Sequence, residues 1–266
     1  MSMRCGLVGD PVAHSLSPDI HAAFAAQCGL DFEYSKTALS EADFAEGVQT
    51  FFDEGGRGLN VTLPHKQRAL ELCSKVDPAA ARAASVNTLC AEADGLHGCS
   101  TDGPGLVADL QRLGAPLEGA RIALIGAGGA ARAVVEPLLA AKPRELVWSH
   151  RNPLRLEGME NTFAGLGPLR LCANLALKGD RFDLVIHATA AGHSGQAPLL
   201  PHSLFAAGGW AYDLSYGDPA QPFLSWARAD GAARTIDGHG MLIEQAALSF
   251  ALWTGHQPDT ASLHRS

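Results

Sequence analysis

The sequence predicts an α/β protein made of two domains. Short segments of strand character alternate with segments of helical character along the first 66 residues, and a second alternating run follows Asp102. A glycine-rich turn at residues 126–131 also lies between an apolar segment and a helical one. Alternating strands and helices are typical of mostly parallel sheets that carry helices on their faces. We therefore expect two successive α/β units, with a boundary near residue 103.

The N-terminal half begins with a strand that runs into a well-marked helix. Ser17 is expected to cap this helix, Pro18 suits its first position and Gly29 suits its end. Pro64 is likewise expected to open a helix, which would place Lys66 in the first helical turn. The strands expected in this half are residues 4–8, 32–37 and 58–63, and the helices are one from Ser17, one over 42–53 and one from Pro64.

The second half repeats the alternation after Asp102, which is expected in a turn before Gly103. The strands expected here are residues 121–125, 145–149, 182–189 and 210–213, and the helices are residues 106–113, 130–139 and 243–253. We expect the domains to comprise residues 1–103 and 104–236, followed by a C-terminal helical segment at 237–266.

Composition excludes several classes of function. The chain has 266 residues and a net charge of −8, which argues against a nucleic-acid groove or binding to an anionic membrane surface. Its six cysteines are scattered, with no Cys-x-x-Cys pair and no Cys/His spacing typical of a metal site, so we expect reduced thiols in a cytoplasmic protein without a bound metal. Met1 leads directly into a strand, which predicts no signal peptide, and Arg132 and Glu136 interrupt the apolar stretch 122–141, which predicts no membrane span.

The glycine-rich turn matches a dinucleotide-binding fingerprint in its usual context, after a strand and before a helix. Glycines there allow a tight turn and the close approach of a pyrophosphate to a helix N-terminus. A tight turn without a ligand is the alternative. The residues expected to bind cofactor here are Gly126, Ala127, Gly128, Gly129, Ala130 and Ala131.

The next strand favours NADP over NAD. NAD sites usually carry an acid at the end of this strand to bind the ribose 2′-hydroxyl. This chain instead has His150, Arg151 and Asn152, with Arg155 close behind. An arginine can hold a 2′-phosphate through two parallel hydrogen bonds, whereas a solvated surface arginine is the alternative.

Eight short segments, in this order and spacing, resemble the shikimate dehydrogenase family across nearly the whole chain. They are Ser15-Leu-Ser-Pro18, Asn60-Val-Thr-Leu-Pro-His-Lys66, Val86-Asn-Thr88, Thr101-Asp-Gly103, Gly126-Ala-Gly-Gly-Ala130, Tyr212-Asp-Leu-Ser-Tyr216, Pro222-Phe-Leu224, and Asp237-Gly-His-Gly-Met241 followed by Gln245-Ala246. The resemblance implies an N-terminal substrate-binding catalytic domain, an NADP-binding Rossmann domain and a C-terminal helix that returns to the first domain. It also implies reversible NADPH-dependent reduction of 3-dehydroshikimate to shikimate.

The resemblance implies that Lys66 and Asp102 flank the reacting oxygen. Hydride reduction of a ketone leaves an alkoxide that needs a proton, and a positioned lysine can supply it. A lysine in a first helical turn would oppose the helix dipole, while a nearby Asp102 would favour the ammonium form. The alternatives are a solvated lysine at a helix start and an aspartate that only forms a turn or caps a helix.

The resemblance also implies the remaining site residues. Ser15 and Ser17 would hold the substrate carboxylate; helix capping is the alternative, and Ser17 can serve both roles. The other expected substrate contacts are Asn60, Thr62, Asn87, Tyr216 and Gln245, and the further expected cofactor contacts are Thr189, Gly238 and Met241. Several neutral hydrogen-bonding groups suit a polyol and reject analogues that lack the hydroxyls.

Five positions depart from the common family pattern, one of which is Asn152. The other four are Ser100, His150, Gln221 and His239. None removes an expected catalytic residue, but together they suggest a divergent paralogue. The alternatives to shikimate dehydrogenase are therefore an enzyme for quinate or another polyol acid, and a catalytically idle module that senses NADP(H). A monomer and a homodimer are both compatible with the sequence.

Overall fold

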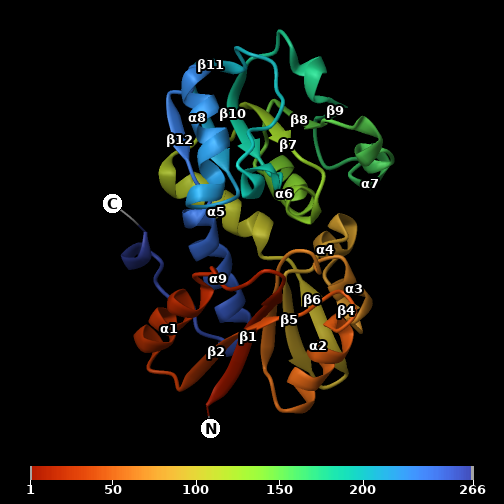
Figure 1. Ribbon diagram of the computed structural model, residues 1–266, viewed down its shortest axis with the longest axis vertical. Helices are drawn as coiled ribbons and strands as arrows, with labels where there is room; N and C mark the ends of the chain where they lie inside the picture. Colours follow the sequence, from red (N-terminus) through yellow and green to blue (C-terminus); the bar gives the residue numbers. More distant parts are fainter. Residues whose placement is uncertain (1, 265–266) are drawn as a thin grey trace. The chain divides into compact units, whose positions relative to one another are not determined.

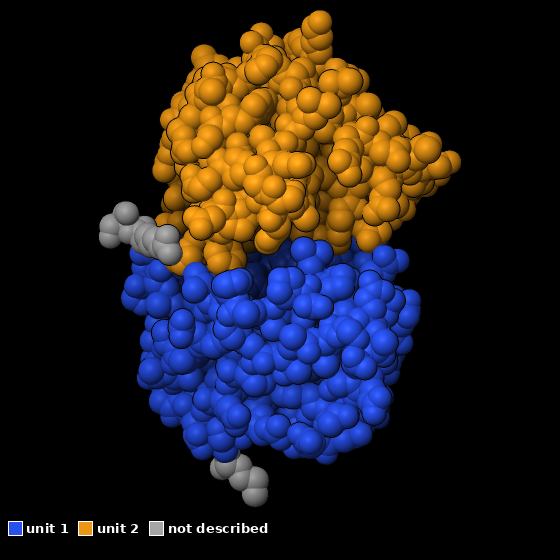
Figure 2. All heavy atoms as spheres, viewed as in Figure 1, with its two compact units in different colours: residues 1–105, 242–266 blue, residues 106–241 orange. Residues whose placement is uncertain are grey.

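The computed structural model describes residues 2–264, and its contacts divide the chain into two compact units (Figures 1 and 2). The first unit comprises the residues up to Gly105 and those from Leu242 onward, and the second comprises Leu106–Met241. The division falls within two helices, α5 (Asp102–Leu113) and α9 (His239–Thr254). The first unit therefore includes a segment from each end of the chain.

The first unit is a six-stranded mixed sheet with helices on both faces. Its strands are β1 (Met3–Gly9), β2 (Phe32–Ala38), β3 (Gly58–Val61), β4 (Lys75–Val76), β5 (Thr88–Glu92) and β6 (Gly95–Cys99), and its other helices are α1 (Ser17–Cys28), α2 (Phe44–Asp53), α3 (Arg68–Glu71) and α4 (Pro78–Ala83). The strand order is β2-β1-β3-β5-β6-β4. β1 pairs in parallel with β2 and β3, as expected, whereas β5 pairs antiparallel with β3 and β6.

The antiparallel hairpin of β5 and β6 was not predicted. Glu92 pairs with Gly95 across a two-residue connection, and Gly95 has a φ of 122°. The dipeptide Asp94-Gly95 is a typical hairpin signal. The hairpin matters for the site because it places Asn87, just before β5, beside the residues that follow β6.

Three helix starts beside the expected site residues differ from those predicted. Leu16, not Ser17, is the residue that precedes the first turn of α1. Pro64 lies in a turn, with the His65 amide donating to the Thr62 carbonyl oxygen at 3.0 Å, and α3 begins only at Arg68.

The third difference concerns Asp102, which is the first residue of α5 rather than part of a turn. The Gly105 amide donates to the Thr101 carbonyl oxygen at 2.9 Å, so helical hydrogen bonding begins before Leu106. Asp102 thus lies in the first helical turn, where a carboxylate is stabilised by the helix dipole, and Lys66 lies in no helix.

The second unit is a six-stranded parallel sheet in the doubly wound order of a Rossmann fold. Its strands are β7 (Arg121–Ile125), β8 (Glu145–His150), β9 (Leu169–Ala173), β10 (Phe182–His187), β11 (Phe205–Asp213) and β12 (Arg234–Ile236), and its other helices are α6 (Gly129–Ala140), α7 (Met159–Thr162) and α8 (Gln221–Ala229). The strand order is β12-β11-β10-β7-β8-β9, and each neighbouring pair is parallel. This order confirms the expected α/β architecture. Strands β9 and β12 were not predicted.

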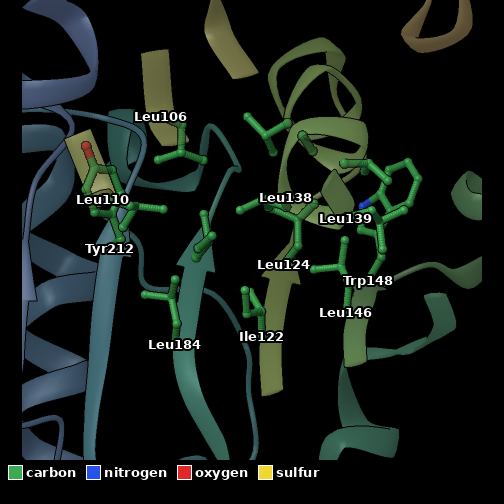
Figure 3. Packing of buried hydrophobic residues seen from close by; sticks show 14 of the residues in the cluster. Leu106, Leu110, Ile122, Leu124, Leu138, Leu139, Leu146, Trp148, Leu184 and Tyr212 are labelled. Atoms are coloured by element: carbon green, nitrogen blue, oxygen red, sulfur yellow. The ribbon is translucent and has the colours of Figure 1, made fainter. Parts of the chain in front are cut away.

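Alternate residues of the central strand β7 pack on opposite faces of this sheet. Ile122 and Leu124 belong to the buried cluster beneath α5 and α6, whereas Ala123 and Ile125 belong to the cluster beneath α8. Figure 3 shows side chains of the first cluster from strands β7, β8 and β10 meeting those of Leu138 and Leu139 of α6. The two-sided burial explains why β7 reads as a continuous apolar run.

The C-terminal helix α9 contributes to the core of the first unit. Ile243 and Phe250 are fully buried against Ile20 and Phe24 of α1. Trp253 donates its indole N–H to the Leu89 carbonyl oxygen of β5 at 3.1 Å. The last helix is therefore part of the structure that holds the first sheet. Within the described residues, no helix combines the length and apolarity that crossing a membrane requires.

Candidate active site

Lys66 and Asp102 form a close ion pair in the first unit. Lys66 Nζ lies 2.5 Å from Asp102 Oδ2, and the two side chains are 14% and 7% exposed. The lysine is held in the turn before α3, where its carbonyl oxygen accepts the Val86 amide at 2.9 Å. The aspartate is held at the start of α5. Partial burial keeps water from screening the pair, while each group still reaches the surface.

Asn87 connects this pair to its surroundings. Its Nδ2 donates to Asp102 Oδ1 at 2.9 Å and also lies 3.3 Å from Gln245 Oε1. Its Oδ1 accepts the Thr101 amide at 2.8 Å. Because the amide both donates and accepts, its orientation is determined by its neighbours. Asn87 thereby fixes the carboxylate that faces Lys66.

Asn60 lies on β3, and a second set of hydrogen bonds fixes it. Its Nδ2 donates to Thr88 Oγ1 at 3.1 Å and to Ser249 Oγ at 3.0 Å, and its Oδ1 accepts the Tyr34 hydroxyl at 2.7 Å. Asn60 is 5% exposed. Its polar groups are thus already satisfied within the protein, which gives it a structural role in addition to the expected contact with substrate.

Ser15 and Ser17 lie together at the start of α1. The Ser15 hydroxyl donates to Ser17 Oγ at 3.1 Å and accepts the Ser17 amide at 3.2 Å. Neither hydroxyl caps the helix in the usual way. Thr62 directly follows β3, and its amide donates to the Val8 carbonyl oxygen at 2.9 Å. All the expected catalytic and substrate residues except Tyr216, which follows β11, lie in the first unit.

The glycine-rich turn of the second unit has the features that a phosphate-binding loop needs. Gly126 has a φ of 135°, and a Cβ at this position would lie 2.5 Å from the Ala188 carbonyl oxygen. A Cβ on Gly128 would meet nothing within 4 Å. The first glycine is thus required by the fold, whereas the second leaves open space at the N-terminus of α6. The rest of the motif, Gly129 to Ala131, forms the first turn of that helix.

Arg132 is a candidate cofactor residue that the sequence reasoning missed. It follows this first turn, and its Nε is buried without an acceptor among the residues that the structure describes. Burial, and then the positive charge of Arg155, lower the pKa of the Arg132 guanidinium below its ordinary value. A buried guanidinium nitrogen without an acceptor among the described residues suits a phosphate oxygen. The available signal was a cation immediately after the fingerprint.

The segment after β8 carries the other expected cofactor residues. Arg151 and Arg155 are exposed, and no acid stands between His150 and Arg155. The side-chain oxygen of Asn152 accepts a hydrogen bond from the Leu154 backbone amide at 3.2 Å. The backbone amide of Asn152 donates to His150 Nδ1 at 3.1 Å. These contacts shape the turn and leave both arginines available to a phosphate.

The remaining cofactor candidates follow β10 and β11. Thr189 lies two residues after β10. A Cβ on Gly238 would lie 2.3 Å from the Leu214 carbonyl oxygen, so this glycine is needed for packing. Met241 is 6% exposed, and its amide donates to the Tyr212 hydroxyl at 3.2 Å. Close packing against Leu214 therefore explains why position 238 is a glycine.

Two family models match parts of this chain. A model described as "Shikimate dehydrogenase substrate binding domain" matches residues 7–89, and one described as "Shikimate 5'-dehydrogenase C-terminal domain" matches residues 238–265. A protein of Alkalilimnicola ehrlichii named "Shikimate dehydrogenase (NADP(+))" is 46% identical over 262 residues, which cover 98% of this chain and 97% of that protein.

Two solved structures match this chain over nearly its whole length. The crystal structure of an Ael1 enzyme from Pseudomonas putida matches with a TM-score of 0.92 and 40% identity, covering 98% of this chain and 97% of that one. Shikimate 5-dehydrogenase from Thermus thermophilus, in complex with NADP(H) and shikimate, matches with a TM-score of 0.86 and 35% identity, over the same shares of the two chains.

Proposed function

Because this chain belongs to the shikimate dehydrogenase family, we propose that it catalyses the reversible NADP-dependent reduction of 3-dehydroshikimate to shikimate. The observation that carries the proposal is the Lys66–Asp102 pair, with its carboxylate fixed by Asn87. A module that only sensed NADP(H) would have no need for a proton donor held in this way.

In the proposed reaction, Lys66 handles the proton. NADPH would supply the hydride, and the carbonyl oxygen of the substrate would take up a proton from the Lys66 ammonium. In the reverse direction, the neutral amine would accept the proton of the shikimate hydroxyl. The Asp102 carboxylate at 2.5 Å orients the Lys66 amino group.

We propose that the first unit binds the substrate. Ser15 and Ser17 offer two neighbouring hydroxyls to the substrate carboxylate, and Tyr216 is a further proposed substrate contact. The hydrogen-bonding groups proposed to face the ring hydroxyls are Asn60, Thr62, Asn87 and Gln245.

We propose that the second unit binds NADP. The open space beside Gly128 suits a pyrophosphate. Arg132, whose Nε has no partner among the described residues, and the exposed Arg151 and Arg155 suit a 2′-phosphate. The other proposed contacts are Thr189, Gly238 and Met241. We place the enzyme in the cytoplasm, as a monomer or homodimer; the six free thiols suit a reducing compartment.

The direct test is turnover by the purified protein. It is incubated with NADP⁺ and either shikimate or quinate, and the absorbance of the reduced nicotinamide is followed. Reduction of NADP⁺ with shikimate is expected. Turnover with quinate alone would reassign the substrate, and binding of NADPH without any turnover would favour the sensing module.

A further inference from the structure

A buried aspartate–histidine pair ends at the hydroxyl of Thr189. His187 and Asp213 are 1% and 0% exposed, and they are direct neighbours in the register of β10 and β11. His187 Nδ1 lies 2.8 Å from Asp213 Oδ2, and His187 Nε2 lies 2.6 Å from Thr189 Oγ1. Neither the proton transfer nor the phosphate contacts described above use this pair.

The chemistry of the groups determines the direction of each hydrogen bond. The Asp213 carboxylate can only accept, and its other oxygen already accepts the Ser215 amide at 2.8 Å. His187 must therefore donate from Nδ1, and in a singly protonated imidazole Nε2 is then an acceptor. The Thr189 hydroxyl then donates its one proton to His187.

This arrangement limits what Thr189 can offer to a ligand. Its oxygen also accepts the Ala191 amide at 3.3 Å. With its proton committed to His187 and one lone pair committed to Ala191, the hydroxyl retains only an acceptor site. The ring of His187 stacks on Phe223 at 4.7 Å between centroids, which holds the imidazole in place.

We propose that Asp213 and His187 are positioning residues that make the Thr189 hydroxyl a hydrogen-bond acceptor toward NADP. The matching group on the cofactor is a donor, such as a ribose hydroxyl or the carboxamide N–H. The inference rests on the proposed placement of Thr189 at the cofactor.

The direction of the hydrogen bond between Thr189 and His187 can be reversed by a substitution that keeps both side chains. In Asp213→Asn, the side-chain oxygen can still accept the Ser215 amide, and the new NH₂ group faces His187 Nδ1. His187 then donates from Nε2, and the proton of Thr189 turns outward.

Asp213→Asn should weaken NADPH binding about 5–10-fold, which is the size of one neutral hydrogen bond. Thr189→Val should do the same, while Thr189→Ser should bind NADPH like the wild type.

A double-mutant cycle on the dissociation constant of NADPH, measured by fluorescence titration, tests the mechanism. If Asp213→Asn acts through Thr189, it adds nothing in the Thr189→Val background. Equal effects of Asp213→Asn in both backgrounds would overturn the inference. The KM for shikimate should stay unchanged in every variant, and circular dichroism checks that each is folded.

One further outcome separates this inference from the proposed function. If Thr189→Val leaves NADPH binding unchanged in an enzyme that still turns over shikimate, Thr189 is not at the cofactor and both the contact and the inference fail. If Asp213→Asn does not fold, His187→Asn replaces it in the cycle. Asparagine can still donate to Asp213 but is too short to reach Thr189, so the same lack of additivity is expected.

Discussion

Asp102 binds Lys66 with one carboxylate oxygen and Asn87 with the other, at 2.5 and 2.9 Å. A single carboxylate therefore determines the position of the ammonium group. Asn87 in turn shares hydrogen bonds with Thr101 and with Gln245 of α9. The proposed proton donor is thus held by segments from the middle and the end of the chain.

Replacement of Lys66 by alanine should lower kcat by about 10²–10⁴-fold, the usual contribution of general acid–base catalysis. The KM for shikimate should change little, because the lysine acts mainly in the transition state. Steady-state kinetics measures both. Lys75→Ala removes an exposed lysine of the same unit and should have no effect. A rise in KM with kcat preserved would make Lys66 a binding residue instead.

The glycine-rich turn offers a matched pair of variants. Gly128→Ala should leave stability unchanged but weaken NADPH binding, since its Cβ fills only open space. Gly126→Ala should destabilise the protein by about 1–3 kcal/mol from the backbone angle alone, and by more from the contact with Ala188. Denaturant unfolding and NADPH titration measure the two effects. Unchanged NADPH binding in Gly128→Ala would argue against a phosphate at this turn.

Replacement of Arg132 by glutamine should raise the KM for NADP⁺ about tenfold, in line with the loss of one charge-assisted hydrogen bond. The KM for NAD⁺, which lacks the 2′-phosphate, should change far less. Kinetics with both cofactors provide the comparison, and Arg181→Gln, at an exposed arginine of the same unit, is the control. An equal effect on both cofactors would place Arg132 away from the 2′-phosphate.

A cluster of two arginines and two acids should make stability depend on pH. Arg121 and Arg170 each contact both Glu145 and Asp180 at 2.8–3.0 Å. Burial alone would raise the pKa of each carboxyl, but the hydrogen bonds from the arginines outweigh it and lower both pKa values. The folded state therefore binds these protons less readily than the unfolded state, and the stabilisation is present above the ordinary pKa of about 4.

Glu145→Gln should accordingly cost about 1 kcal/mol at pH 7, a value reduced for the solvent exposure of the cluster. The difference from the wild type should shrink as the pH falls below about 4, where the carboxyl groups are protonated. Urea unfolding at pH 7 and pH 3 measures it. A difference as large at pH 3 as at pH 7 would assign the effect to packing rather than to charge.

Ser100, a departure from the family pattern, should contribute nothing to stability. Its hydroxyl is buried without a partner among residues 2–264, so Ser100→Ala should leave the free energy of unfolding unchanged or raise it by about 1 kcal/mol. Ser249→Ala, which removes hydrogen bonds to Asn60 and Thr88, should lower it by about 1–3 kcal/mol. A clear loss of stability in Ser100→Ala would show that the hydroxyl has a partner in solution.

Local signals were sufficient for much of the second unit. The apolar run 121–125 and the glycines after it predicted β7 and the start of α6 to within one residue. They failed for the short strands β9 and β12, whose residues are only partly buried and show no distinctive pattern. They also failed at Pro64, because a proline suits both the first position of a helix and a turn.

The sequence by itself determined the alternation of strands and helices, the glycine-rich turn and the identity of most residues at the proposed site, Arg132 excepted. Backbone preferences and side-chain periodicity act over a few residues, so they can be read from the chain alone. Only the tertiary structure decided which of these residues meet. Asn87 and Gln245 are 158 positions apart but share a hydrogen bond, and Asp102 starts a helix facing a lysine that belongs to none. Such contacts arise from the packing of whole elements against one another, which no local pattern specifies.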